Sequence, residues 1–140
     1  MSLSIRNQVP GTVTAVTSGP ALTTVKVRLR GGQEVTAAIT AEAVEELGID
    51  AGAAVTVLVK STEVALAIDR VEGLSIRNRL PGTVTEVIPG GAVACVKLSI
   101  EEGELTSVIT QEAVADLRLV PGSPVVALVK STEVALRAVP

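Results

Sequence analysis

The strongest constraint on this chain is that one sequence unit occurs twice. Two segments recur without change: LSIRN, at Leu3–Asn7 and Leu74–Asn78, and KSTEVAL, at Lys60–Leu66 and Lys130–Leu136. The copies lie 71 residues apart at LSIRN and 70 residues apart at KSTEVAL, so the second copy has lost one residue. We place that loss near Glu101–Gly103, opposite Arg30–Gly32. A fixed repeat of this length indicates two similar structural units, and we expect two domains, residues 1–70 and 71–140.

The composition indicates that neither unit stands alone. A unit of about 70 residues buries only part of its surface and is marginally stable by itself, and this chain lacks every aromatic residue. Yet 47% of its residues are hydrophobic, and its mean hydropathy is +0.52. Since a large exposed apolar surface marks an interface, we expect the units to pack against each other and against other chains, in an oligomer with cyclic symmetry.

Charge and residue types exclude several classes of function. The net charge is −3 and neither half carries a basic tract, so we expect neither nucleic acid nor a membrane surface as partner. The chain has no histidine and a single cysteine, Cys95, which we expect to be a small core or strand residue. We therefore expect no enzyme activity, no catalytic residues, no bare metal site and no organic cofactor. The absence of a signal segment or membrane span predicts a cytoplasmic protein.

The local pattern predicts short strands with one helix in each unit. In the first unit, β-branched residues favour strands over 12–16, 25–29, 35–40, 54–59 and 64–68, and Gly31-Gly32 predicts a hairpin. Ala41–Leu47 carries good helix formers, with Thr40 as N-cap and Gly48 as a left-handed C-terminal residue. The second unit repeats this order: a strand from Thr83, strands Val93–Ile100 and Leu105–Thr110, a helix over Gln111–Leu117, and the final strands.

This order predicts an all-β fold with one short helix per unit. Five or six short strands with a helix before the last pair are typical of a small Greek-key barrel of the OB type. We expect two such barrels in tandem. The linker Asp69–Gly73 is too short to let them move independently, so they should be rigidly juxtaposed.

Polar residues that both copies retain suggest a site used twice. They are cations, hydroxyls and one amide: Ser4/Ser75, Arg6/Arg77, Asn7/Asn78, Thr40/Thr110, Lys60/Lys130, Ser61/Ser131 and Thr62/Thr132. Converging Arg, Lys and hydroxyl donors fit a compact, multiply charged oxyanion. The alternative is a polar set that only stabilises contacts, in which Arg6 pairs with Glu63, Ser61-Thr62 forms a turn between two strands, and Thr40 caps its helix and nothing more. Descent of both copies from one duplication also explains shared residues.

At these residues the chain resembles a known family. An SxRN motif near each unit's start, followed by PGTV, an IT segment before the helix, and KSTEV near its end, is similar to the Mop family of molybdate- and tungstate-binding domains, the molbindins. The resemblance covers nearly the whole chain, as two Mop units in tandem. It implies an OB-like Mop fold and a homotrimer, a pseudo-hexamer of units, with oxyanions held between units.

The resemblance also implies which residues bind the anion. Carried over by motif, they are Ser4, Arg6, Asn7, Lys60 and Ser61 in the first unit and Ser75, Arg77, Asn78, Lys130 and Ser131 in the second, with Thr40 or Thr110 approaching from a neighbouring unit. Some family members add a serine and an arginine from the helix. Here those places hold Ala43 and Glu46, then Ala113 and Asp116, so either the helix faces away or those sites bind weakly. Backbone-lined sites on the threefold axis cannot be assigned from side chains.

The resulting hypothesis is a non-catalytic protein that stores and buffers molybdate or tungstate inside the cell. Two alternatives remain open. One is an oxyanion sensor acting through a partner protein, because the units run from Leu3 to about Val139 and leave no room for an effector domain in the same chain. The other is a purely structural oligomer.

Overall fold

The computed structural model describes residues 3–140, and its elements follow the repeat. The first repeat contains β1 (Asn7–Thr17), β2 (Leu22–Leu29), β3 (Glu34–Thr40), α1 (Ala41–Leu47), β4 (Ala54–Val59), the 3₁₀ turn η1 (Ser61–Glu63) and β5 (Ala65–Ala67). The second contains β6 (Asn78–Gly90), β7 (Val93–Ile100), β8 (Gly103–Thr110), α2 (Gln111–Asp116), β9 (Pro124–Val129), the 3₁₀ turn η2 (Ser131–Glu133) and β10 (Ala135–Ala138). The expected all-β fold with one short helix per unit is confirmed.

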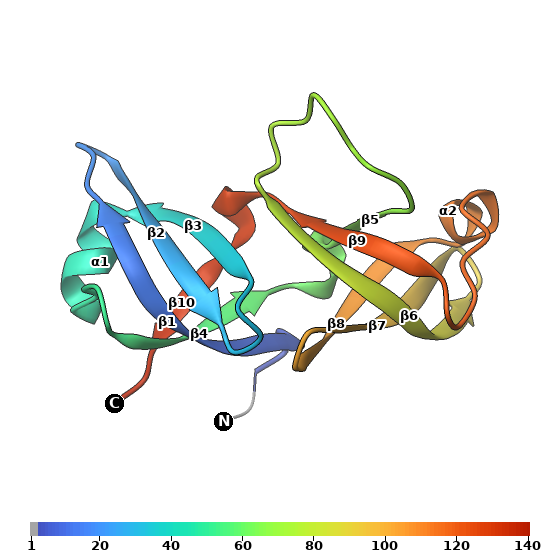
Figure 1. Ribbon diagram of the computed structural model, residues 1–140, viewed down its shortest axis with the longest axis horizontal. Coiled ribbons are helices and arrows are strands. Elements are labelled where there is room, and N and C mark those ends of the chain that lie inside the picture. Colours follow the sequence, from blue (N-terminus) through green and yellow to red (C-terminus); the bar gives the residue numbers. More distant parts are fainter. Residues whose placement is uncertain (1–2) are drawn as a thin grey trace.

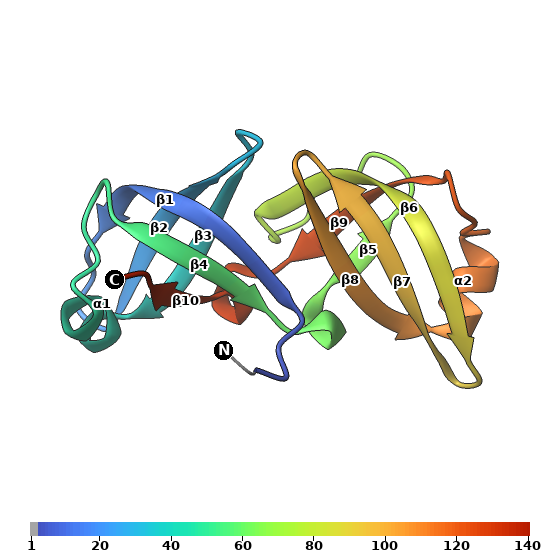
Figure 2. The same cartoon turned by 90° about the horizontal axis from the view of Figure 1, so that it is seen from below.

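The strands form two curled, antiparallel, five-stranded sheets that lie side by side (Figures 1 and 2). Their strand orders are β10-β4-β1-β2-β3 and β5-β9-β6-β7-β8. The last strand of each repeat is therefore exchanged, because β5 pairs with β9 and β10 pairs with β4. Each sheet therefore contains one strand from the other repeat, on the far side of the expected boundary between residues 70 and 71. The division of the chain into two domains at that boundary stays a prediction.

Local sequence explains most element boundaries. In β2, buried and exposed residues alternate along the whole strand, as expected for a strand with one wet face. Thr40 accepts a hydrogen bond from the Ala43 amide at 3.1 Å, and Gly48 ends α1 with φ 62°, which confirms both predicted caps. The predicted position of the lost residue, in the β7–β8 hairpin, is confirmed. Arg28 pairs with Glu34 across the β2–β3 hairpin, whereas its counterpart Ser99 pairs with Glu104, so the second hairpin is shorter by one residue.

Three strand predictions were wrong in extent. β1 and β6 begin at Asn7 and Asn78, about five residues before the predicted starts at Thr12 and Thr83. β5 is only Ala65–Ala67, because the preceding residues form η1. The alternative in which Ser61-Thr62 forms a turn between two strands is confirmed, because η1 and η2 lie between the last two strands of each repeat.

The hydrophobic core is shared between the repeats. Buried valine, leucine and isoleucine side chains from both sheets form one cluster, and residues of both repeats surround a small internal cavity of about 20 Å³. Because no aromatic side chains are available, the core is filled mainly by β-branched residues in the alternate positions of the strands. The expectation that the two units pack against each other is confirmed.

The helices lie at opposite ends of the molecule, α1 beside the first sheet and α2 beside the second (Figures 1 and 2). Within residues 3–140, no helix is long and apolar enough to cross a membrane.

Candidate functional site

A hollow of about 550 Å³ lies between the start of the first repeat and the sheet of the second. Its lining is drawn from both repeats: Ser4, Ile5, Arg6, Lys60, Ser61 and Thr62 from the first, and Ile88, Cys95, Lys97, Thr106 and Val108 from the second. The hollow thus brings together the first repeat's Ser4, Arg6, Lys60 and Ser61. Its volume is typical of a small-molecule site.

Strand pairing explains why two motifs so far apart in sequence meet. β1 and β4 are antiparallel, and Asn7 at the start of β1 pairs with Val59 at the end of β4. Arg6 and Lys60 lie just outside this pair, so both flank strand ends that meet at the same end of the sheet. Asn78 pairs with Val129 in the same way, so Arg77 and Lys130 lie just outside the equivalent pair of the second sheet.

The hollow is rich in donors. No carboxylate belongs to its lining, while Arg6, Lys60 and Lys97 are all exposed in it. Arg6 Nη2 donates to the Leu3 carbonyl at 2.6 Å, which leaves the other guanidinium hydrogens available. In the described part of the chain Arg6 makes no ion pair with Glu63, so that alternative is not what the structure contains.

One polar atom in the hollow lacks a partner. The Ser61 hydroxyl oxygen is buried, and no hydrogen-bonding group among residues 3–140 reaches it. A buried hydroxyl without a hydrogen bond costs free energy, so its presence in a working protein calls for a ligand or solvent partner. With two flanking cations, an oxyanion fits this donor set.

The second repeat is arranged differently. Arg77 lines a separate hollow of about 450 Å³, together with Arg70, Val71, Glu72, Gly73, Arg79, Pro81, Val126 and Leu128. Lys130 and Ser131 do not line it, and a carboxylate, Glu72, does. Arg79 donates to the carbonyls of Val71, Leu74 and Ile76, so it holds the connection between the repeats in place.

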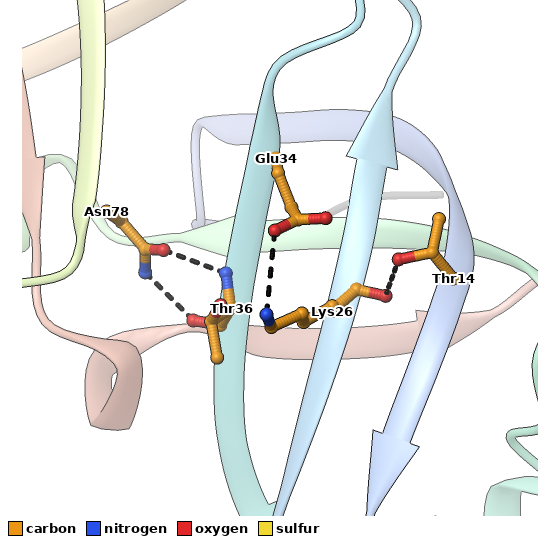
Figure 3. A network of polar contacts seen from close by, with 5 residues as sticks. All are labelled: Thr14, Lys26, Glu34, Thr36 and Asn78. Atoms are coloured by element: carbon orange, nitrogen blue, oxygen red, sulfur yellow. Dashed lines mark hydrogen bonds and ion pairs between the residues drawn. The ribbon is translucent and has the colours of Figure 1, made fainter.

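Asn7 and Asn78 have structural contacts of their own. Asn7 Nδ2 donates to the Thr106 carbonyl at 2.8 Å, and Asn7 Oδ1 accepts from the Thr106 amide at 2.7 Å. Asn78 makes the equivalent pair with Thr36, at 2.9 and 2.8 Å (Figure 3). Both side chains are buried. Each asparagine therefore binds the edge strand of the other repeat, and its direct contact with an anion stays a prediction.

Thr40 and Thr110 cap the two helices and do not line the hollow. Each hydroxyl accepts a hydrogen bond from the third residue of its own helix, at 3.1 Å. The helices that they cap lie at opposite ends of the molecule (Figure 2). The acidic residues Glu46 and Asp116 belong to these helices and do not line the hollow.

Sequence reasoning missed the residues of the hollow's second wall. Lys97, Thr106 and Cys95 line it from β7 and β8. A signal was present, because Lys97 and Thr106 correspond to Lys26 and Thr36 in the first repeat. None of these four strand positions was among the predicted binding residues.

Comparison with known proteins identifies both repeats. The TOBE domain model matches residues 3–66 and again residues 74–136. The molybdenum-pterin-binding protein MopB of Rhodobacter capsulatus is 38% identical over 135 residues, which cover 95% of this chain and 50% of MopB. The molybdenum transport protein ModE of Herbaspirillum seropedicae is 35% identical over 133 residues, which cover 94% of this chain and 49% of ModE. The chain thus spans about half the length of these curated relatives.

A solved structure matches the whole fold. The cytoplasmic molybdate-binding protein ModG, in a crystal form with molybdate bound, superposes with a TM-score of 0.95 at 40% identity and covers 100% of both chains. Two domain matches and a full-length structural neighbour agree with the duplicated motifs. The chain belongs to the TOBE domain family, as a tandem di-Mop molbindin.

Proposed function

We propose that this chain binds molybdate or tungstate reversibly and stores and buffers these oxyanions in the cytoplasm, without transforming them chemically. The observation that carries the proposal is the hollow in which Arg6, Lys60 and the unpartnered Ser61 hydroxyl converge without a carboxylate. The relatives support it, since ModG is described as a molybdate-binding protein.

The donor types suit a tetrahedral dianion. Arg6 offers planar N–H groups, Lys60 a compact ammonium, and Ser4 and Ser61 rotatable hydroxyls. Charge-assisted hydrogen bonds of this kind are about twice as strong as neutral ones. Together they replace water around the anion at a position fixed by the β1–β4 pairing.

Selection against sulfate must come from size. Sulfate and molybdate are both tetrahedral dianions with similar hydrogen-bonding demands, so donor chemistry alone separates them poorly. A rigid site whose donors stand at the distance of the larger anion favours molybdate and tungstate, because the smaller anion leaves donors unpaired.

A homotrimer, a pseudo-hexamer of Mop units, is part of the proposal. Large apolar side chains are exposed at equivalent positions of the two repeats, Leu22 at 52% and Val93 at 48%. Covering such residues is a reason for chains to associate. In that assembly Thr40 or Thr110 of a neighbouring chain approaches the anion.

Thermal unfolding in the presence of oxyanions tests the proposal. A ligand at 100 times its dissociation constant stabilises the folded state by about 2.7 kcal/mol, which raises the Tm of a chain of this size by about 5 to 10 °C. We expect that rise with molybdate or tungstate, and a much smaller rise with sulfate at equal ionic strength. Equal Tm values in all three salts would refute the proposed function.

A further inference from the structure

The second wall of the hollow carries a cation that the motif comparison does not assign. We propose that Lys97 is a third cationic ligand of the oxyanion site built on Arg6 and Lys60, and that this makes the two motif sets of the chain unequal. The inference rests on the proposed function and adds to it a binding residue and a site preference.

The docking of the two repeats brings Arg6 and Lys97 to one hollow. In the β7–β8 ladder Lys97 pairs directly with Thr106, and Thr106 is the residue whose backbone binds the Asn7 amide. Arg6 precedes Asn7 in the chain. The same two hydrogen bonds that dock the first repeat on the edge strand β8 therefore bring Arg6 and Lys97 into the lining of one hollow.

Lys97 differs from its repeat-related counterpart in its partners. Lys26 Nζ lies 3.9 Å from Glu34 Oε1 on the neighbouring strand (Figure 3). Within residues 3–140, no carboxylate or hydrogen-bond acceptor partners the Lys97 ammonium. The counterpart of Glu34 is Glu104, which pairs with Ser99 and does not line the hollow.

Three cations and no carboxylate line this hollow, which favours an anion there. Two groups of carboxylates lie nearby outside its lining: Glu86 is opposite Lys97 in the β6–β7 register, and Lys60 also borders a smaller hollow with Glu63 and Glu133. The positive charges of Arg6, Lys60 and Lys97 repel one another, and each of them is attracted by a bound dianion, which offsets that repulsion. The motif of the second repeat lacks this arrangement. Lys26, the counterpart of Lys97, is paired with Glu34, and Arg77, the counterpart of Arg6, lines a hollow with Glu72. The structure thus assigns the tighter oxyanion site to the first repeat's motif.

Cys95 supplies a reporter that responds to this hollow alone. It is the single cysteine of the chain, it is half-buried, and it lines the hollow beside Lys97. The rate at which iodoacetamide alkylates its thiol, followed by mass spectrometry, measures access to the hollow. Bound tungstate should slow that rate.

The experiment measures the tungstate concentration that gives half-protection of Cys95 in four proteins: the unaltered chain, Lys97→Ala, Lys97→Arg and Lys26→Ala. Loss of one charge-assisted contact weakens binding by about 10- to 100-fold, so we expect that shift for Lys97→Ala. Lys97→Arg should restore most of the protection, and Lys26→Ala, which removes the same charge, should shift it less than about threefold. Lys97 is exposed, so the replacements leave the core intact.

Each contrary result has a distinct meaning. If equilibrium dialysis shows that the unaltered chain binds no tungstate, the proposed function and this inference both fail. If dialysis shows binding but Cys95 is not protected, or if Lys97→Ala and Lys26→Ala shift protection equally, only the role of Lys97 is overturned.

Discussion

Replacing Asn78 with alanine tests the contact that joins the two repeats. The Asn78 side chain is 2% exposed, and its amide exchanges two hydrogen bonds with the backbone of Thr36, at 2.8 and 2.9 Å. Thr36 lies in β3, the edge strand of the first sheet. The Asn78 side-chain amide therefore forms the kind of hydrogen-bond pair with β3 that a neighbouring strand would form, and it comes from the second repeat.

The magnitude follows from what alanine leaves behind. Each hydrogen bond contributes about 1 kcal/mol net, and a buried backbone group left without a partner costs about 1–3 kcal/mol. Because β3 is an edge strand, water reaches part of the vacated space and limits the penalty. We expect Asn78→Ala to lower the free energy of unfolding by about 2–4 kcal/mol, a large share of the stability of a typical protein.

Urea denaturation followed by far-UV circular dichroism measures this loss, since the chain has no aromatic residue to serve as a fluorescence probe. Gln8→Ala is a matched control. The Gln8 side chain donates a local hydrogen bond of 2.9 Å to Ile5 and is exposed, so its removal should cost less than about 0.5 kcal/mol. A loss below about 1 kcal/mol for Asn78→Ala, or one equal to that of Gln8→Ala, would show that the asparagine does not hold the repeats together.

Other changes give further outcomes. Arg6→Ala combined with Arg77→Ala should abolish most tungstate binding in equilibrium dialysis while native mass spectrometry still shows the assembled oligomer, because each arginine supplies charge-assisted hydrogen bonds to the anion and neither side chain is buried; retained uptake would contradict this. Gly82→Ala should cost about 1–3 kcal/mol, since a Cβ there lies 2.5 Å from the Ser99 carbonyl oxygen, and an unchanged urea midpoint would count against that contact. Ser107→Ala should cost about 1 kcal/mol, as it removes the buried 2.6 Å hydrogen bond to Val64; a gain in stability would be the opposite result.

The sequence predicted those elements whose signals are local. The helix over Ala41–Leu47 is correct to the residue, because a threonine N-cap and a left-handed glycine mark its two ends. The early part of β1 was missed because Pro10-Gly11 resembles a strand break. Pro10 is tolerated there because β1 pairs with β4 at that point, while its pairing with β2 begins only at Gly11.

Strand exchange is a feature that local sequence cannot decide. Lys60–Leu66 and Lys130–Leu136 are identical, so β5 and β10 offer nearly the same pairing edge to either sheet. What selects the partner is the path of the chain after η1 and η2, which each contact the edge strand of the other repeat. That path depends on tertiary contacts such as the Ser107 hydrogen bond to Val64, which no single-unit pattern reveals.

The candidate site was predictable in part for the same reason. Arg6 and Lys60 meet through the antiparallel pairing of one repeat with itself, so their motif spacing carries the information. Lys97 joins them only through the docking of one repeat on the other. A site between repeats is visible in sequence as retained residues, and its composition becomes clear only when the docking is known.

Diffraction from crystals grown with tungstate, recorded at a wavelength where tungsten scatters anomalously, tests the site most directly. We predict an anomalous peak in the hollow, within hydrogen-bonding distance of the Arg6 guanidinium, the Lys60 ammonium and the Ser61 hydroxyl. Tungsten peaks found only elsewhere on the molecule, or no peak at saturating tungstate, would contradict the assignment of this hollow as the oxyanion site.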